Sequence, residues 1–242
     1  NLKKNTNPIV NVENKVVIHF VRGPFVEIKG GKVAEYKVEF IDNKSGKIYY
    51  STTIKNNMWT RCSIEYFVEW NIKIYENGKL WYEYLYDAKD KRVYIAIDSK
   101  ALGDSLAWFA YVDEFRKKHN CTVIVSTFRN EMFAPLYPNL EFVGRGAVVN
   151  NIKALYRLGW FYDKDKEPVL PSTIPLQKTA SNILGLDYQE IHSKIYFEPK
   201  ERPYSDKYIC IAPSSTAACK LWNNPDGWSS LTKYLINKGY KI

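Results

Sequence analysis

Asp104 is the residue of this sequence whose position most favours catalysis. It follows a continuous apolar run at residues 93–97, which predicts a buried strand, and it ends a polar turn at residues 98–104. Apolar residues then recur at helical spacing over residues 105–118. Because α/β sheets bind ligands at the carboxyl ends of their inner strands, Asp104 is a candidate catalytic base. An Asp at a helix start also acts as a cap, and the spacing alone leaves both roles open.

Four further residues are candidates to line a cleft around this turn. Gly103 precedes the carboxylate and predicts either a close approach of a ligand or an unusual backbone angle. Lys100 lies in the same turn and is a candidate substrate contact, although a solvated lysine is the plainer interpretation. Arg157 and Trp160 are candidates from a later segment, and the alternative for both is packing of a long loop on the sheet.

A second polar loop has the composition of a phosphate site. The apolar run at residues 208–212 predicts a strand, and hydroxyl, cationic and aromatic residues follow it. These candidate donor-binding residues are Ser214, Ser215, Thr216, Lys220 and Trp222. Hydroxyl and backbone donors together with a lysine hold phosphate, and Trp222 either stacks on a ligand or wedges the loop. The loop lacks the GxxxxGK[ST] spacing, which argues against an NTPase.

Metal chemistry has little support in the residue types. The three histidines form no HxxxH pair, and no two of the four cysteines are spaced as CxxC. We therefore predict no metal ligands, and we interpret the cysteines as reduced thiols of a cytoplasmic protein. They are Cys62, Cys121, Cys210 and Cys219.

The composition excludes some classes of protein and favours others. The 242 residues carry a formal net charge of +9, spread along the chain rather than gathered in a block, which mildly favours anionic ligands. No nucleic-acid reader motif is present, so we expect no nucleic-acid partner. No apolar stretch of about twenty residues occurs, so we expect no membrane span. No secretory signal is visible, and the initial Asn rather than Met is consistent with a start upstream.

The chain changes character near residue 88. Before that point β-branched and aromatic residues alternate with polar ones, and the turns GGK, DNKSGK and ENGK predict antiparallel hairpins. We therefore predict a β-rich sandwich or barrel over residues 1–88. Strands and helices then alternate over residues 89–205, typical of a parallel sheet, with a loop from residue 156 leading to a helix at about 175–185.

Residues 206–242 predict the start of a second α/β unit. A strand at 208–212 and a helix at 228–239 are followed by KGYKI, which has the pattern of another parallel strand. The polar segment 197–206, with two prolines, is the predicted linker. Because one strand and one helix do not form a stable sheet, we expect this second unit to be truncated.

The two polar loops together resemble those of bacterial heptosyltransferases. The segments ALGDSLAW (101–108) and PSSTAACKLW (213–222) are similar to the GD loop and the SS…KxW loop of that family. With GPFVEI (23–28), YRLGWF (156–161) and the β-rich start, the chain resembles the autotransporter O-heptosyltransferase branch. The resemblance implies an α/β fold with an N-terminal all-β domain and two Rossmann-like domains, the second one truncated here.

The resemblance also implies a reaction. Asp104 would be the base that deprotonates a serine of an autotransporter passenger domain, and Lys220 with the nearby hydroxyls would hold the diphosphate of a nucleotide-activated (ADP-) heptose. Members of this branch bind iron through a cysteine cluster, but none is visible here, so no ligand is carried over. A homo-oligomer and a cytoplasmic location complete the expectations.

Two alternatives to this enzyme stay open. In the first, the β-rich region binds a partner protein and the α/β part is a non-catalytic accessory subunit of a glycosylation system. In the second, the protein is a glycosyltransferase that uses another sugar donor, because the family's donor-selecting loop is not present before Ile242.

Overall fold

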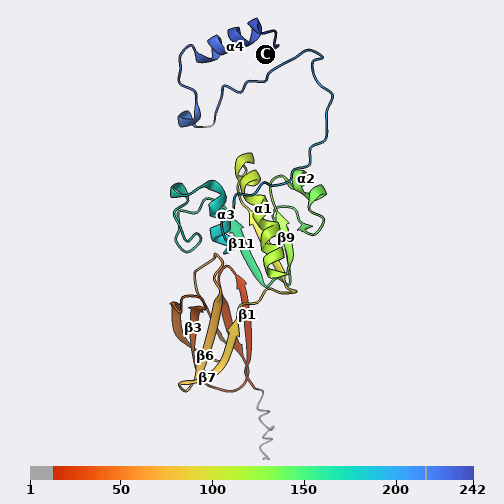
Figure 1. Ribbon diagram of the computed structural model, residues 1–242. Helices are drawn as coiled ribbons and strands as arrows, with labels where there is room; N and C mark the ends of the chain where they lie inside the picture. The colour runs from red at the N-terminus through yellow and green to blue at the C-terminus, as the bar shows by residue number, and fades with distance from the viewer. Residues whose placement is uncertain (1–12, 216) are drawn as a thin grey trace, which may run out of the picture. The chain divides into compact units, whose positions relative to one another are not determined.

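The computed structural model describes residues 13–215 and 217–242 (Figure 1). The chain divides into two compact units, one up to Tyr196 and one over Phe197–Ile242, and each is described by itself. This division falls at the start of the predicted linker. The boundaries predicted at residues 88 and 205 stay predictions.

A seven-stranded mixed sheet organises the first unit. Its strands, in spatial order, are β10 (Glu141–Phe142), β9 (Thr122–Ser126), β8 (Arg92–Ile97), β11 (Ala154–Leu158), β1 (Lys15–Val21), β2 (Phe25–Lys29) and β5 (Met58–Arg61). The pairs from β10 to β1 are parallel, and the pairs β1–β2 and β2–β5 are antiparallel. Three strands from the β-rich start of the chain thus continue the parallel sheet.

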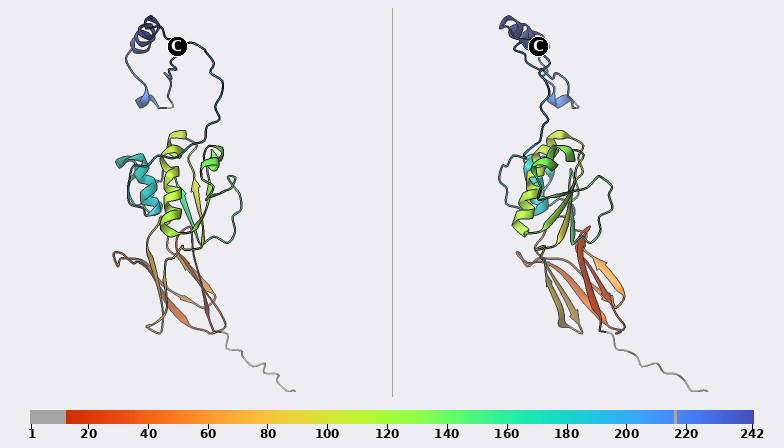
Figure 2. Two further views of the ribbon diagram at one scale, coloured as in Figure 1. Left: turned by 45° about the vertical axis from the view of Figure 1, so that its right-hand side comes forward. Right: turned by 90° about the vertical axis from the view of Figure 1, so that its right-hand side faces the viewer.

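A second, four-stranded antiparallel sheet packs with the first (Figure 2). Its order is β4 (Ile48–Lys55), β3 (Glu35–Asp42), β6 (Trp70–Glu76) and β7 (Lys79–Leu85). Val26 and Ile28 of the first sheet share one hydrophobic core with Val38 and Ile74 of the second. The turns DNKSGK and ENGK close hairpins as predicted, whereas GGK connects the two sheets, because β3 pairs with β4 and β6 rather than with β2.

Two helices cover one face of the parallel strands (Figures 1 and 2). The helix α1 (Leu102–His119) follows β8 and packs beside α3 (Leu176–Leu184). Alternate residues of β8 point to this face, and Val93, Ile95 and Ile97 are fully buried there. The remaining helical segments of this unit are short. They are α2 (Asn130–Phe133) and the 3₁₀ turns η1 (Ala134–Leu136) and η2 (Pro171–Thr173).

The prediction of a loop from residue 156 was wrong at its start. Ala154–Leu158 forms β11, the strand between β8 and β1. The alternation of Ala154, Tyr156 and Leu158, all buried, with exposed Arg157 is the strand signal that the sequence carried. The predicted strand at residues 93–97 and the predicted helices at 105–118 and about 175–185 are confirmed as β8, α1 and α3.

The second unit has little regular structure. It contains the 3₁₀ turn η3 (Ala218–Lys220) and the helix α4 (Gly227–Asn237), as predicted for the helix. The predicted strand at 208–212 is reduced to a parallel bridge between Tyr208 and Lys241. Hydrogen bonds from Ile209 N to Lys241 O and from Lys241 N to Lys207 O, both 2.9 Å, extend that bridge. Within the ranges described, neither unit has a helix long and apolar enough to cross a membrane.

The end of α3 gives a stability prediction. Gly185 has a φ of 62°, and a Cβ there would lie 2.0 Å from Cδ1 of the buried Phe67. We expect Gly185→Ala to lower the free energy of unfolding by about 3 kcal/mol, because it adds backbone strain to a clash in the core. Gly78→Ala is the control, since Gly78 has a φ of 76° but open space around it, so about 1 kcal/mol is expected. Urea unfolding measures both, and equal losses would contradict the role of Phe67.

Candidate functional site

The loop between β8 and α1 places Asp104 at the carboxyl edge of the parallel strands. The N-cap of α1 is Ala101, which makes no side-chain capping bond, and Asp104 is the third residue of the helix. Asp104 is only 9% exposed. The capping role left open by the sequence is therefore wrong, because the carboxylate binds other groups.

Two neutral donors hold one oxygen of this carboxylate. Ser99 Oγ donates to Asp104 Oδ2 at 2.6 Å, and Trp160 Nε1 donates to the same oxygen at 2.8 Å. Among the described residues no hydrogen bond reaches Oδ1 of Asp104. Because both donors are on Oδ2, the orientation of the carboxyl group is fixed while its other oxygen stays available to an incoming proton.

The end of β11 positions Trp160 for this contact. Since β11 runs parallel to β8, both strands end at the same edge of the sheet. Gly159 turns the chain, and a Cβ there would lie 2.8 Å from the ring of Phe161. The Trp160 ring lies 6.2 Å from that of the buried Trp108, and the residue is 44% exposed. The indole N–H of Trp160 thus binds the carboxylate while part of the side chain remains open to solvent.

Lys100 lies in the loop before α1, and Gly103 lies in the first turn of this helix. Gly103 has an ordinary helical conformation, so the predicted unusual backbone angle is wrong. A Cβ at Gly103 would meet no atom within 4 Å, which leaves open space at the helix start. Lys100 is exposed, and its Nζ lies 5.7 Å from the centre of the Phe128 ring.

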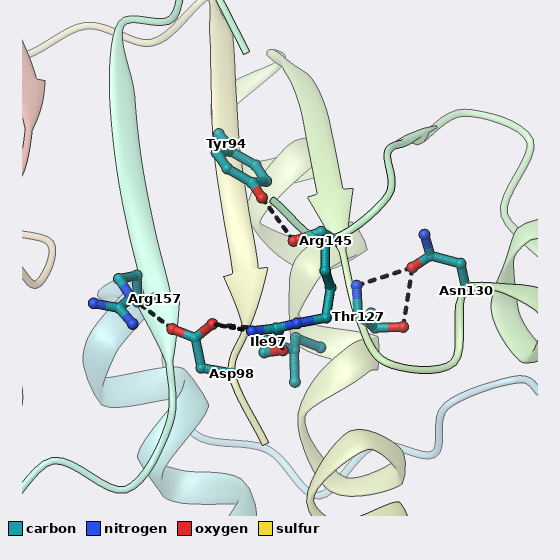
Figure 3. Close-up of polar contacts among 8 residues, drawn as sticks. Tyr94, Ile97, Asp98, Thr127, Asn130, Arg145 and Arg157 are labelled. Carbon is teal, nitrogen blue, oxygen red and sulfur yellow. Dashed lines mark hydrogen bonds and ion pairs between the residues drawn. The ribbon is translucent and has the colours of Figure 1, made fainter. Parts of the chain in front are cut away.

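Arg157 does not join Asp104. It lies on the face of the sheet away from α1, and its Nε donates to Asp98 Oδ2 at 2.5 Å (Figure 3). Arg145 approaches the same aspartate, with its Nη1 and Nη2 3.4 Å from Oδ1. Asp98 is thus bound between two arginines, directly before the serine that orients Asp104.

The predicted phosphate loop lies in the second unit. Ser214, Ser215 and Lys220 are exposed, as expected of groups that meet a ligand. Ser215 Oγ accepts a hydrogen bond of 3.5 Å from Ala217 N, and Lys220 ends the turn η3. Thr216 lies outside the described residues.

Trp222 packs on the start of α4. Its ring meets that of Trp228 edge to face at 5.2 Å, and a Cβ on Gly227 would lie 2.8 Å from it. Trp222 is nevertheless 48% exposed, so one side remains open. The Trp222 ring thus packs against the start of α4 on one side and leaves part of its surface open to a ligand.

The described residues do not fit a metal centre. Over residues 13–215 and 217–242, no group of three or more His, Cys, Asp or Glu side chains is arranged to hold an ion. Burial raises the pKa of the Cys62 thiol and raises that of Cys121 to about 11, which disfavours the thiolates that bind metals. Cys210 and Cys219 are exposed and free.

The sequence interpretation missed Ser99, Asp98 and Arg145. Ser99 and Asp98 stand in the same turn as Asp104, so their polar types at the end of a buried strand were a usable signal. Arg145 gave no such signal, because it follows β10 in an irregular segment and reaches Asp98 across 47 residues.

The chain is similar to a set of bacterial proteins along nearly its whole length. The autotransporter heptosyltransferase Aah of Escherichia coli is 32% identical over 97% of this chain and 61% of its own length. TibC of Escherichia coli O78:H11, also named an autotransporter heptosyltransferase, is 30% identical over 86% of this chain and 52% of its own. BimC of Burkholderia thailandensis, named an inactive autotransporter heptosyltransferase, is 33% identical over 74% of this chain and 44% of its own. No protein-family model matches.

Comparison with solved structures also finds similarity to an autotransporter heptosyltransferase. A crystal structure of TibC from enterotoxigenic Escherichia coli, described as an iron-containing dodecameric glycosyltransferase, matches with a TM-score of 0.83 at 27% identity. It covers 94% of this chain and 60% of the TibC chain. TibC in complex with ADP-D-beta-D-heptose matches with a TM-score of 0.82 at 26% identity over the same shares.

The resemblance noted in the sequence is therefore confirmed. The mixed α/β fold matches that of the TibC glycosyltransferase, and the sequence is similar to those of autotransporter heptosyltransferases. It spans 61% or less of the length of the three relatives named above.

A buried carboxyl group supports the loop that carries Trp160. Glu167 is 2% exposed, and its Oε2 accepts a hydrogen bond of 3.3 Å from Phe161 N, the residue after Trp160. Its Oε1 has no partner among the described residues. Burial raises the pKa of Glu167 from its ordinary 4.5 to about 7, because the charged carboxylate loses its hydration in the interior.

This group gives a pH prediction. Because the folded pKa lies above the unfolded one, the folded state binds more protons between pH 4.5 and 7, so the free energy of unfolding falls as pH rises through that window. We expect Glu167→Gln to remove this fall, which is on the order of 3 kcal/mol. Urea unfolding at pH 5 and pH 8 measures it. His119, whose pKa burial lowers to about 4, acts in the opposite sense in both proteins, so the difference isolates Glu167.

The exposed Glu131 provides the control for that experiment. Glu131→Gln should follow the wild-type profile. If Glu167→Gln also follows it, the carboxyl group of Glu167 ionises at its ordinary pKa in the folded protein.

Proposed function

We propose that this protein is an O-glycosyltransferase that transfers heptose from ADP-heptose to serines of an autotransporter passenger domain. The observation that carries the proposal is the Asp104 carboxylate, oriented through Oδ2 by Ser99 and Trp160 in a chain homologous to heptosyltransferases. The donor follows from TibC, whose complex contains ADP-D-beta-D-heptose, and the acceptor from the names of the relatives.

In the proposed reaction Asp104 acts as the general base. As the serine oxygen attacks the anomeric carbon of heptose, its proton passes to Asp104 Oδ1. The bond from that carbon to the donor diphosphate breaks, and ADP leaves with the electron pair. Ser99 and Trp160 keep the carboxylate aimed during attack. Positioned proton transfer of this kind contributes about 10²- to 10⁴-fold in rate.

The leaving group is proposed to be held by the second unit. The ammonium of Lys220 and the hydroxyls of Ser214 and Ser215 would offset the charge that grows on the departing diphosphate. Trp222 presents an open aromatic face on which the nucleotide base or the sugar can stack. Thr216, in the same loop, is included on its sequence position alone.

The domain organisation is part of the proposal. We take residues 1–88 as a β-rich domain, 89–205 as the acceptor-side Rossmann-like domain, and 206–242 as the start of the donor-binding one. The parallel bridge between Tyr208 and Lys241, on either side of α4, supports a Rossmann-like connection there.

The description of TibC supports a proposal about the oligomeric state of this protein but not one about its metal content. Since TibC is described as dodecameric, we propose that this protein also forms a homo-oligomer, located in the cytoplasm. TibC is also described as iron-containing. The described residues do not fit an iron site, so no step of the reaction is derived through iron.

A non-catalytic accessory subunit is the second candidate. The observation that favours it is the 33% identity to BimC, a relative named as inactive. A glycosyltransferase with another sugar donor is the third, and a panel of nucleotide sugars distinguishes it from the first.

The first prediction from this function concerns Asp104. Asp104→Asn keeps an oxygen for Ser99 and Trp160 but removes the base, so we expect transfer to fall by at least about 10²-fold with an unchanged melting temperature. The measurement is the intact mass of a passenger-domain fragment after incubation with ADP-heptose. Glu114→Gln, an exposed change on the same helix, is the control and should keep full activity. Transfer by Asp104→Asn at the wild-type rate would remove this residue from the mechanism.

The second prediction concerns the donor. Lys220→Ala should weaken ADP-heptose binding by about tenfold, because the diphosphate loses a charged partner. Calorimetric titration of the donor measures it, with Lys238→Ala in the same unit as the control. An unchanged donor affinity would show that Lys220 does not contact the phosphates.

A further inference from the structure

A polar pocket of about 330 Å³ lies on the face of the parallel strands away from α1, and its lining includes Asp98, which precedes the candidate base by six residues in the chain. It opens at the carboxyl ends of the central parallel strands. The residues that line it are Arg22, Tyr94, Ala96, Asp98, Ser126, Arg145, Gly146, Ala147, Leu155 and Arg157. The proposed reaction leaves this pocket without a role.

The floor of the pocket is set by the strand register. Arg157 of β11 pairs with Ala96 of β8, and Ala96 pairs with Ser126 of β9, so the three share one face. The small side chain of Ala96 leaves a hollow between its larger neighbours. On the same face Tyr94 Oη and Ser126 Oγ are hydrogen-bonded at 2.7 Å, which puts neutral polar groups beside the hollow.

Arg145 forms the opposite wall and is held in place. Its Nη1 donates to the carbonyl of Ile97 at 3.1 Å, and its guanidinium lies 3.7 Å from the centre of the Phe128 ring. Asn130 anchors the start of its loop. The Nδ2 of Asn130 donates to Val143 O at 2.8 Å, and its Oδ1 accepts from Thr127 N and Oγ1 at 2.9 and 3.0 Å (Figure 3).

The pocket has an excess of positive charge. Three arginines line it, whereas Asp98 is the single carboxylate among its lining residues, which leaves a net charge of +2. The side chains of Arg145 and Arg157 remain 36% and 48% exposed, although both approach Asp98. Arg22 is exposed as well. Planar guanidinium groups that keep contact with solvent are suited to a carboxylate or phosphate ligand.

The chain between the pocket and the candidate base is very short. Asp98 lines the pocket, and the next residue, Ser99, donates to Asp104. Extended peptides advance about 3.3–3.6 Å per residue, so an acceptor with its serine at Asp104 can place a side chain from a few residues away in this pocket.

We propose that this pocket binds the carboxylate of a glutamate or aspartate near the target serine of the acceptor polypeptide, with Arg145 and Arg157 as its specificity-determining residues. The inference rests on the proposed function for its acceptor. A peptide carboxylate is favoured over the donor phosphates because the second unit already carries the serine- and lysine-containing loop for the diphosphate. The excess positive charge of the pocket therefore complements the acceptor polypeptide rather than the nucleotide-sugar donor.

The test compares two labelled peptides by fluorescence anisotropy with the full protein. One peptide has a single serine flanked by glutamates, and the other has glutamines in their place. We expect the wild type to bind the glutamate peptide about tenfold more tightly. The double variant Arg145→Gln/Arg157→Gln should lose this preference. Lys29→Gln/Lys55→Gln removes the same charge from exposed sites outside the pocket and should keep it.

A second variant guards against misfolding of the first. Ala96→Leu fills the hollow without a change of charge, so it should also abolish the preference at an unchanged melting temperature. Equal binding of the two peptides by the wild type, or a preference that survives both pocket variants, would overturn the proposal. So would displacement of the glutamate peptide by inorganic phosphate at a lower concentration than by glutarate, since the pocket would then be a phosphate site.

The outcome is independent of turnover. Asp104→Asn should bind the glutamate peptide as the wild type does, because Asp104 lies outside the pocket. A protein that never transfers heptose but shows arginine-dependent peptide binding would contradict the proposed function and leave this inference standing. Transfer of heptose without a preference for the glutamate peptide would support the proposed function and contradict this inference.

Discussion

The parallel pairing of β8 with β9 and β11 is the constraint on which the rest of the molecule depends. It fixes three strands so that they end at one edge, and the fully buried Val93, Ile95 and Ile97 hold that arrangement against α1 and α3. Each residue of the candidate site in the first unit therefore lies within a few residues of the carboxyl end of one of these strands. Trp160 comes two residues after β11, Ser99 comes two residues after β8, and Asp104 lies in the first turn of the helix that follows.

Two carboxylates near the end of β8, one in the loop after this strand and one in the first turn of α1, have opposite surroundings. Asp98 faces away from α1 and is bound by Arg145 and Arg157, so its charge is already compensated. Among the described residues, the donors to Asp104 are neutral, a hydroxyl and an indole, and both bind one oxygen. A cationic partner on Asp104 would lower the affinity of its carboxylate for a proton. Neutral donors on Oδ2 orient the carboxylate and leave Oδ1 able to accept the proton of the proposed acceptor. The two aspartates therefore differ in their chemical environment because their hydrogen-bond partners differ, although both are the same residue type.

The sequence predicted the elements that local patterns specify. The strand before Asp104 is a continuous apolar run, and α1 and α3 are proline-free segments rich in apolar residues, while the resemblance to heptosyltransferases depended mainly on two short loops. β11 was missed because it has only five residues, directly before Gly159, and so short an alternation is difficult to distinguish from a loop. The contact between Trp160 and Asp104 spans 56 residues and depends on that strand, so it could not be derived before the strand was known.

The two units differ in how much structure positions their candidate residues. Asp104, Ser99 and Trp160 are fixed by a continuous core and by hydrogen bonds that cross the sheet edge. Ser214, Ser215 and Lys220 are exposed, and the regular structure near them is a 3₁₀ turn, one helix and an isolated bridge. Preorganised groups stabilise a transition state without reorganisation, whereas exposed lysines lose side-chain entropy when they bind. The proposed base is thus fixed by the fold, whereas the proposed phosphate loop would lose side-chain entropy on binding a ligand.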